Sequence, residues 1–190
     1  WLSILLLPKN KLFMKNKLLL LVLYILYCTL CNAQLQIISS VRLDELKLKM
    51  PVDSVNKVLG TSLQVKVSKY EFSTDTMWTM YKGDSVRLVF NRYITEKKQV
   101  ETSLQNIYSA AKTLKTKSGI KHGDSKFDII KKLDGSTMRI APDWFFENAP
   151  DKKLRSAVVL YDYDNYSIVI FHFYNNLLYA FECAYTPDAE

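Results

Sequence analysis

Glycine and histidine are scarce in this chain of 190 residues, which contains five glycines and two histidines. A glycine-rich phosphate-binding loop, a Gly-x-Ser-x-Gly nucleophile turn and a His-Glu-x-x-His zinc motif are all absent from the sequence. A protein zinc site needs three or four ligands, whereas His122 and His172 stand in two different predicted elements, a loop before a helix and a strand. We therefore predict no catalytic residues, no cofactor, no metal site and no enzymatic activity.

Cysteine is also rare, with three residues, and two of them lie near the N-terminus. Cys28 and Cys31 have the Cys-x-x-Cys spacing of thiol redox proteins, but they lie in an apolar stretch without a βαβ pattern, so a redox function is not indicated. Without these two residues, Cys183 has no partner for an internal disulfide. A folded domain beyond residue 33 must then be held together by its hydrophobic core. The part of the chain beyond residue 33 is long enough to bury such a core.

Strand geometry argues against Cys183 and His172 as a nucleophile and its base. If Asn175 and Asn176 form a two-residue hairpin loop, His172 lies opposite Tyr179, and Cys183 shares its face four residues further along. That separation is about 13 Å, at roughly 3.3 Å per residue. Proton transfer needs a distance of about 3 Å, so the sequence predicts no such pair.

Residues 14–33 have the composition of a secretory signal peptide. Met14 is followed by two lysines, then by an unbroken apolar run over 18–26 and the cleavage-site pattern Cys31-Asn32-Ala33. The apolar run is shorter than the roughly 20 residues that span a bilayer. We predict cleavage after Ala33, with residues 1–13 as mistranslated upstream sequence. The mature protein is then periplasmic or extracellular and has no integral membrane span.

The leader has two alternative interpretations. A retained N-terminal anchor would have to include the apolar residues 2–7, and a Pro-Lys-Asn-Lys segment interrupts them. Lipid attachment to Cys28 or Cys31 is less favoured, because lipoprotein signals place a small residue directly before the modified cysteine. Tyr27 and Leu30 stand at those positions.

The formal net charge of +7 is largely a property of the leader. Residues 1–33 contain four lysines and no acidic residue, so the remainder has 22 basic against 19 acidic residues, a net charge of +3. This remainder has neither a block of basic residues nor an alternation of arginine with aromatic residues. Nucleic acid is therefore not a predicted partner.

A short segment occurs twice in the chain. Residues 49–60 (KMPVDSVNKVLG) are echoed by residues 123–134 (GDSKFDIIKKLD). Each copy predicts a short helix with one apolar face, followed by strands. In the first copy, Pro51 suits the first helical position. In the second, Ser125 and Asp128 have the spacing of a capping box in an acidic variant.

We therefore predict an α+β fold with two tandem repeats of a short helix plus an antiparallel β-meander, the helices packed on one sheet face. Repeat 1 spans 34–98 and repeat 2 spans 117–190, with an insertion at 139–153. Residues 99–116 are predicted as a connecting strand, although their apolar spacing also permits a helix. The predicted strands are 63–67, 77–81 and 86–90 in repeat 1, and 157–161, 166–174 and 177–185 in repeat 2.

The segment Gly119-Ile120-Lys121-His122-Gly123-Asp124-Ser125, with its apolar residues three apart and its following strands, resembles a known family of repeats. These are the helix–strand repeats of the beta-lactamase-inhibitor-protein-like fold, shared by small outer-membrane assembly lipoproteins of the SmpA/OmlA type and by exported proteins of Bacteroidetes-like bacteria. Repeat 1 departs from the pattern, with Lys49 where repeat 2 has Gly123. The resemblance implies a helix pair on an antiparallel sheet that binds another protein, and it implies no active-site residues.

Two groups of acidic residues are candidate sites. Asp162, Asp164 and Asn165 have the oxygen ligands that calcium prefers, but the glycine and distal glutamate of an EF-hand loop are missing. Asp-Asn is also ordinary turn chemistry, so we predict a hairpin turn there. Asp143 and Glu147, in the insertion, are predicted to lie in a solvated loop.

The last predicted hairpin is apolar or aromatic on both faces, whereas an antiparallel sheet with one solvated face alternates with polar residues. One face must meet the helices, and the other is either covered by the insertion around Trp144 or exposed as a binding surface. Tyrosine and tryptophan bring large contact area with few rotatable bonds, so His172, Tyr174, Tyr179 and Trp144 are the candidate partner-binding residues. The predicted face consists of Ile168, Ile170, His172 and Tyr174 opposite Leu177, Tyr179, Phe181 and Cys183.

The sequence therefore predicts an exported, non-enzymatic binding module that presents an aromatic β-sheet face to a protein partner. The cell envelope is one location where such a partner could lie. Two alternatives stay open. One is a lipoprotein-like structural component of envelope assembly. The other is a hydrolase with an unrecognised carboxylate site.

Overall fold

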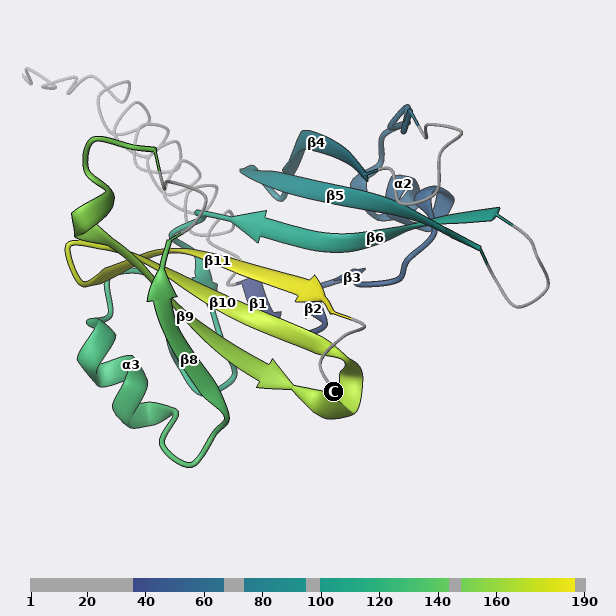
Figure 1. Ribbon diagram of the computed structural model, residues 1–190. Helices are drawn as coiled ribbons and strands as arrows, with labels where there is room; N and C mark the ends of the chain where they lie inside the picture. The colour runs from purple at the N-terminus through teal and green to yellow at the C-terminus, as the bar shows by residue number, and fades with distance from the viewer. Residues whose placement is uncertain (1–35, 67–73, 95–99, 144–147, 187–190) are drawn as a thin grey trace, which may run out of the picture. The chain divides into compact units, whose positions relative to one another are not determined.

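The computed structural model describes residues 36–66, 74–94, 100–143 and 148–186 (Figure 1). The described part is α+β, as predicted, with two β-sheets and two α-helices. The larger sheet has seven strands, all paired antiparallel, in the order β4 (Thr74–Tyr81), β5 (Asp84–Ile94), β6 (Val100–Ser109), β11 (Leu177–Tyr185), β10 (Ser167–Tyr174), β9 (Arg155–Asp162) and β8 (Met138–Pro142).

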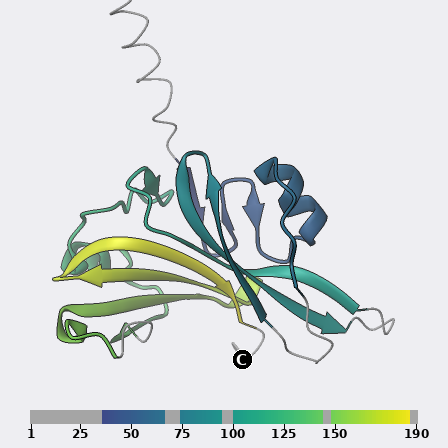
Figure 2. The same ribbon diagram turned by 90° about the horizontal axis from the view of Figure 1, so that it is seen from above.

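The smaller sheet has four short strands, in the order β3 (Leu46–Lys47), β2 (Arg42–Leu43), β1 (Gln36–Ser39) and β7 (Leu114–Lys115). The pairing of β1 with β7 is parallel. Helix α2 (Val52–Leu59) lies beside these short strands in Figure 2. Helix α3 (Lys126–Lys132) follows β7, and two single 3-10 turns, η2 (Lys152–Leu154) and η3 (Tyr163–Asn165), flank β9.

Local signals for helices and turns are confirmed with small shifts. Pro51, predicted at the first helical position, is instead the N-cap of α2, one position before the helix begins at Val52, and Gly60 ends that helix with φ of 64°. The Ser125 side chain accepts a hydrogen bond from the Asp128 amide and donates one to the Asp128 carboxylate, at 3.2 and 2.6 Å. Asn175 and Asn176 form the last hairpin turn with φ of 49° and 64°, the positive values that a primed turn requires.

The predicted strands 77–81, 86–90, 157–161 and 177–185 are confirmed within β4, β5, β9 and β11, and 166–174 is confirmed from Ser167 onward. The stretch that permitted either a helix or a strand contains β6 and β7. The prediction of a strand at 63–67 is wrong for Leu63 to Lys66. The Leu63 amide there donates to the Asn56 side chain at 2.8 Å, so this segment is attached to the end of α2. Val67 lies outside the described residues.

A β-bulge changes which residues share a face of the last hairpin. Next to the turn, Phe173 pairs with Leu178 as predicted, but the register shifts between His172 and Phe173, and His172 lies opposite Ala180. Tyr179 is the additional residue. Because a one-residue shift moves every following side chain to the other face, the prediction that Cys183 shares the face of His172 is wrong.

Phe181 and Cys183 consequently belong to the hydrophobic core, in which both are fully buried. Burial raises the pKa of the Cys183 thiol, so it stays protonated. The core cluster also contains Val55 of α2, Ile129 of α3 and Phe171 of β10. Both helices and the seven-stranded sheet therefore contribute to one core. The opposite face of this sheet carries other side chains.

Candidate partner-binding face

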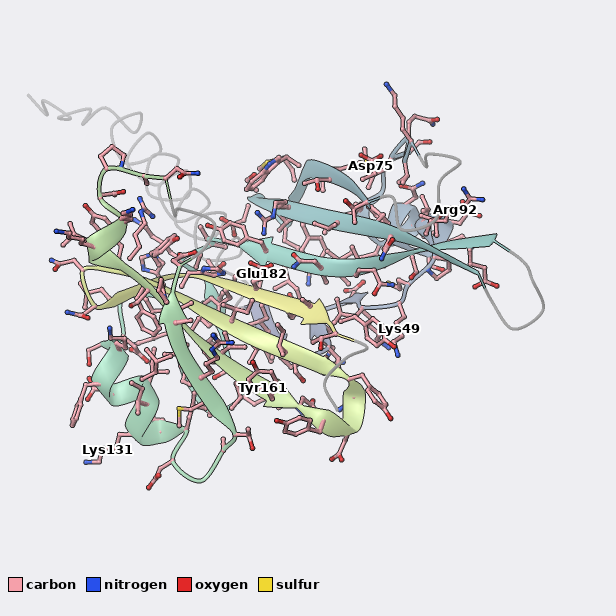
Figure 3. The ribbon with its side chains drawn as sticks, in the orientation of Figure 1. Lys49, Asp75, Arg92, Lys131, Tyr161 and Glu182 are labelled. Atoms are coloured by element: carbon pink, nitrogen blue, oxygen red, sulfur yellow. The ribbon has the colours of Figure 1, made fainter. Side chains whose placement is uncertain are left out.

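The sheet face opposite the core carries a line of aromatic and charged side chains. Trp78 on β4 pairs with Arg87 on β5, Arg87 pairs with Tyr108 on β6, and Tyr108 pairs with Glu182 on β11. Directly opposed residues in antiparallel strands share a face. These four side chains therefore form one line across four strands, and Figure 3 labels Glu182 in the middle of the sheet.

The rings on this face contact one another in sequence. Trp78 and Tyr108 meet edge to face at 6.0 Å between centroids, Tyr108 and His172 do so at 5.5 Å, and His172 and Tyr179 lie 6.2 Å apart. Such tilted and edge-to-face arrangements are the favoured ones for aromatic pairs. The rings thus form a continuous series from the edge strand to the bulge of β11.

Two arginines lie over these rings. The Arg87 guanidinium is 4.9 Å from the Tyr108 ring, and the Arg155 guanidinium is 5.7 Å from the Tyr179 ring and 5.0 Å from the Tyr174 ring. Cation–π contacts of this kind hold planar groups in fixed positions. We call the complete set the aromatic–arginine row: Trp78, Arg87, Tyr108, His172, Tyr179, Arg155 and Tyr174.

A buried ionic network lies at the centre of the row. His172 Nδ1 is 3.1 Å from Asp143 Oδ2, and His172 Nε2 is 3.0 Å from Glu182 Oε2, with all three side chains about 1% exposed. Burial by itself disfavours the charged ring, but the hydrogen bonds to the two carboxylates outweigh it, and the pKa of His172 is raised. A protonated histidine ring donates from both nitrogens, and here each nitrogen faces a carboxylate.

Further donors complete the network. Glu182 also accepts from the Arg87 guanidinium at 3.3 Å and from the Asn106 amide, and Asp143 accepts from the Tyr179 hydroxyl at 3.0 Å. Burial and the neighbouring Asp143 raise the pKa of Tyr179, which keeps this hydroxyl a donor. The two carboxylates thus face the His172 ring and the Arg87 guanidinium.

Small residues make room for the network. His172 pairs with Ala180 on one side and Ala157 on the other, and Ala157 pairs with Ala141 on β8. All three alanines are buried. Asp143 follows β8 directly, so this edge strand brings its carboxylate to the ring.

Of the residues chosen from the sequence, the structure brings His172, Tyr174 and Tyr179 onto one face. Tyr174 is 41% exposed and Tyr179 is half-buried, but His172 is completely buried and offers no surface to a partner. Trp144 lies outside the described residues. His172 therefore acts as a support for the exposed members of the row.

The prediction of a solvated loop at Asp143 is wrong, since that side chain is buried and contacts His172 and Tyr179. Glu147 lies outside the described residues. The sequence also did not identify Arg87 and Glu182 as members of this face. Glu182 lies on it only because of the bulge. No local sequence signal marks Asp143, Arg87 or Glu182 as a site residue.

This arrangement is suited to holding a surface rigid and not to acid–base chemistry at the ring. Both nitrogens of the buried His172 ring lie against carboxylates, so neither nitrogen is open to a substrate. The nearby Cys183 lies on the opposite sheet face as a buried, protonated thiol. The effect of the network is to hold Tyr179, Arg87 and Tyr108 in fixed positions.

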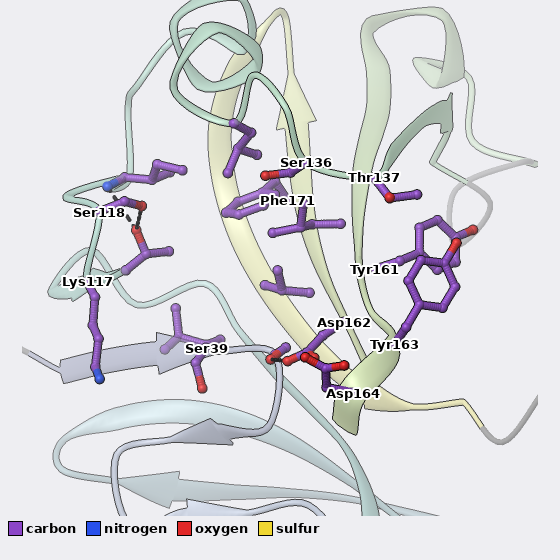
Figure 4. Close-up of a pocket in the computed structure, with 17 residues that line it drawn as sticks. Ser39, Lys117, Ser118, Ser136, Thr137, Tyr161, Asp162, Tyr163, Asp164 and Phe171 are labelled. Carbon is purple, nitrogen blue, oxygen red and sulfur yellow. Dashed lines mark hydrogen bonds between the residues drawn. The ribbon is translucent and has the colours of Figure 1, made fainter. Parts of the chain in front are cut away.

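A pocket of about 570 Å³ lies on the core side of the sheet (Figure 4). Apolar residues such as Phe171 form its depth, and hydroxyl side chains such as Ser39, Ser118 and Thr137 surround its mouth. This combination is typical of a site for a small, largely apolar group.

Asp162 borders this pocket and belongs to the segment whose side-chain oxygens resemble calcium ligands. Burial opposes its charge, but hydrogen bonds from Ser40, at 2.5 Å, and from Asn165 outweigh burial and lower its pKa. The Asn165 amide donates to Asp162 in the η3 turn, so the prediction of a turn at this position is confirmed. Across the described ranges, no three His, Cys, Asp or Glu side chains are placed to hold a metal ion.

Comparison of the chain with protein-family models, with curated proteins and with solved structures gave no match. Among the residues described, no helix is long and apolar enough to cross a membrane. Among the described residues, the aromatic–arginine row joins seven aromatic and charged side chains on one sheet face.

Proposed function

We propose that this chain is an exported, non-enzymatic binding module that presents the aromatic–arginine row to a protein partner. The observation that carries the proposal is the continuity of the row from Trp78, 60% exposed, to Tyr174, 41% exposed. Tryptophan, tyrosine and arginine are the residues enriched among those that dominate binding energy at protein interfaces. A row with such composition at both exposed ends is expected to be a recognition surface.

The network beneath the row supports the same proposal. Binding costs free energy when flexible side chains must be ordered. Arg155 is already held by Asp151 in two hydrogen bonds, at 2.9 and 3.1 Å, and it contacts Tyr174 and Tyr179. Arg87 is held by Glu182. These arginines lose little freedom when a partner covers them.

We further propose a duplicated architecture, in keeping with the resemblance to the beta-lactamase-inhibitor-protein-like fold. The support is the strand order, because α2 precedes the meander β4–β5–β6, α3 precedes the meander β9–β10–β11, and the two third strands pair with each other. Val55 of α2 and Ile129 of α3 are the buried residues that would pack on the same sheet face. In this proposal the row crosses the junction between the two repeats.

Export by the predicted leader, residues 14–33, places the mature protein in the periplasm or outside the cell. An intact-mass measurement of the mature protein tests this part separately. A chain that begins at Gln34 without added mass is the expected result. A diacylglyceryl adduct on a cysteine would favour the lipoprotein-like alternative.

Alanine substitution at the exposed ends of the row tests the binding function. We expect Trp78→Ala and Tyr174→Ala each to weaken capture of a partner from the cell-envelope fraction about tenfold or more, which corresponds to about 1.4 kcal/mol. Both side chains are exposed, Trp78 to 60% and Tyr174 to 41%, so thermal unfolding should change little. Affinity is measured by titrating immobilised mature protein with the captured partner.

Phe127→Ala is the matched control for this experiment. Phe127 is an aromatic residue on α3, 75% exposed and outside the row, so its removal should leave both capture and stability unchanged. The proposal fails if the control reduces capture as much as the two row variants do. It also fails if Trp78→Ala and Tyr174→Ala bind like the wild type.

A further inference from the structure

Strand β4 forms one outer edge of the seven-stranded sheet, and β5 is the strand paired with it among the described residues. Lys82 and Gly83 form a two-residue turn between the paired residues Tyr81 and Asp84. Residues that flank such a turn exchange hydrogen bonds with each other, and the next pair does not. The backbone N–H and C=O groups of Met80 therefore point away from β5.

The same alternation continues along β4. Outward-pointing backbone groups belong to Thr74, Thr76, Trp78 and Met80, and no described residue hydrogen-bonds to them. Unpaired N–H and C=O groups in this spacing are complementary to the backbone of another extended strand. The edge is eight residues long and has no register shift.

This edge also lacks the features that usually prevent strand pairing. The sequence of β4 is TDTMWTMY, with no proline, lysine or arginine, and Asp75 is its one charged residue (Figure 3). The opposite edge strand, β8, is different, because it has five residues and includes Arg139 and Pro142. Charge and proline are common protections of sheet edges. Among the described strands of this sheet, β4 is thus the unprotected edge.

Trp78 and Met80 add an apolar contribution on one face of the edge. They are 60% and 58% exposed, and both lie at positions whose backbone groups also point outward. An added strand would therefore gain hydrogen bonds and place its own side chains beside these two large ones. Such combined recognition is the usual basis of strand addition.

We propose that β4 pairs antiparallel with β4 of a second copy of this chain, with Trp78 opposite Trp78 on a two-fold axis. The strand is self-complementary in this register. Thr76 faces Met80 of the second copy, and Asp75 faces Tyr81, so no like charges oppose each other. All residues keep their own sheet face, because directly opposed residues in an antiparallel pair share a face.

A second copy is the occupant that the two edges of the sheet favour. Pairing of β4 with β4 is isologous and stops at a dimer, whereas pairing of β4 with β8 would repeat without end. The residues of β8 block the second arrangement, as described above. The dimer continues the sheet and brings two aromatic–arginine rows together, but it does not depend on the proposed partner binding.

Replacing Thr76 by proline tests the dimer. In the proposed register the Thr76 amide donates to the Met80 carbonyl of the second copy, and proline removes that donor without removing a β4–β5 hydrogen bond. We expect the wild type to show a concentration-dependent dimer in the micromolar range by sedimentation equilibrium. Thr76→Pro should weaken the dimer at least about tenfold.

Thr76→Val is the matched control, because it changes the same side chain and keeps the amide N–H. It should dimerise like the wild type. The proposal is overturned if the wild type is monomeric throughout that range, or if Thr76→Pro dimerises as well as Thr76→Val. A β4 edge that stays monomeric but binds an extended segment of another protein would also overturn it.

The same variants separate this inference from the proposed function. Thr76→Pro leaves Tyr174 and Arg155 in place, so capture of a protein partner that contacts this end of the row should persist in the monomer. Tyr174 lies on β10, far along the strand order from β4, so Tyr174→Ala should leave the dimer intact. Loss of one property without the other shows which proposal has failed.

Discussion

Replacing Glu182 by alanine is expected to lower the free energy of unfolding by about 3–5 kcal/mol, the range found when one partner of a buried ion pair is removed. The Glu182 carboxylate is about 1% exposed and accepts hydrogen bonds from His172, Arg87 and Asn106. Its removal would leave those three donors, two of them cationic, without their shared acceptor. Urea-induced unfolding, followed by far-UV circular dichroism, measures the change.

Glu45→Ala is the matched control for this prediction. Glu45 is 69% exposed and its carboxylate lies 3.9 Å from the Lys82 ammonium. Exposed ion pairs of this kind contribute less than about 1 kcal/mol, so the control should unfold almost like the wild type. If Glu182→Ala costs as little as Glu45→Ala, the network is not a structural support of the row.

Features specified by short segments could be predicted from the sequence. The turn at Asn175 and Asn176 depends on two neighbouring residues that tolerate positive φ, and the cap of α3 depends on Ser125 and Asp128. The strands β9, β10 and β11 follow from β-branched and aromatic content. In each case the physical cause lies within a few residues of the feature.

Features that depend on pairing at a distance could not be predicted. The bulge at Tyr179 has no marker such as glycine, yet it decides that Glu182 and not Phe181 lies beside His172. The sequence predicts a solvated loop at Asp143 because nothing in it fixes the position of this side chain relative to Glu147. The burial of Asp143 results from the pairing of β8 with β9, which the sequence did not indicate.

The bulge also resolves the apparent contradiction of a hairpin with two apolar faces. Without the shift, Phe181 and Cys183 would lie on the face of His172, and Glu182 would not reach the ring. With the shift, Ala180 and Glu182 occupy that face, and the alanine leaves room for the ring. One inserted residue therefore converts an apolar face into a polar network, and the network fixes the tyrosines and arginines of the row.

The stability of the protein should fall as the pH rises above about 6.5, and His172 should be a principal cause. The folded state holds the His172 proton through Asp143 and Glu182, so the pKa is raised above the ordinary value of about 6.5 that applies to the unfolded chain. Between these two pKa values the folded state binds more protons than the unfolded state. Its contribution to stability is complete below about 6.5 and is lost as the pH rises through the folded-state pKa, at up to about 1.4 kcal/mol per pH unit.

Unfolding of the wild type and of His172→Gln at a series of pH values from 6.5 to just below 8 checks this expectation. Glutamine cannot titrate, so the variant should be less stable overall and should show a flatter pH dependence. The difference between the two proteins isolates His172 from His122, whose pKa burial and the neighbouring Lys112 lower, and which is present in both. The upper limit keeps the measurement below the unfolded-state ionisation of Cys183, near 8.5. Equal pH slopes for the two proteins would mean that His172 is not held as an imidazolium, and the row would then lack the charged support on which its fixed geometry depends.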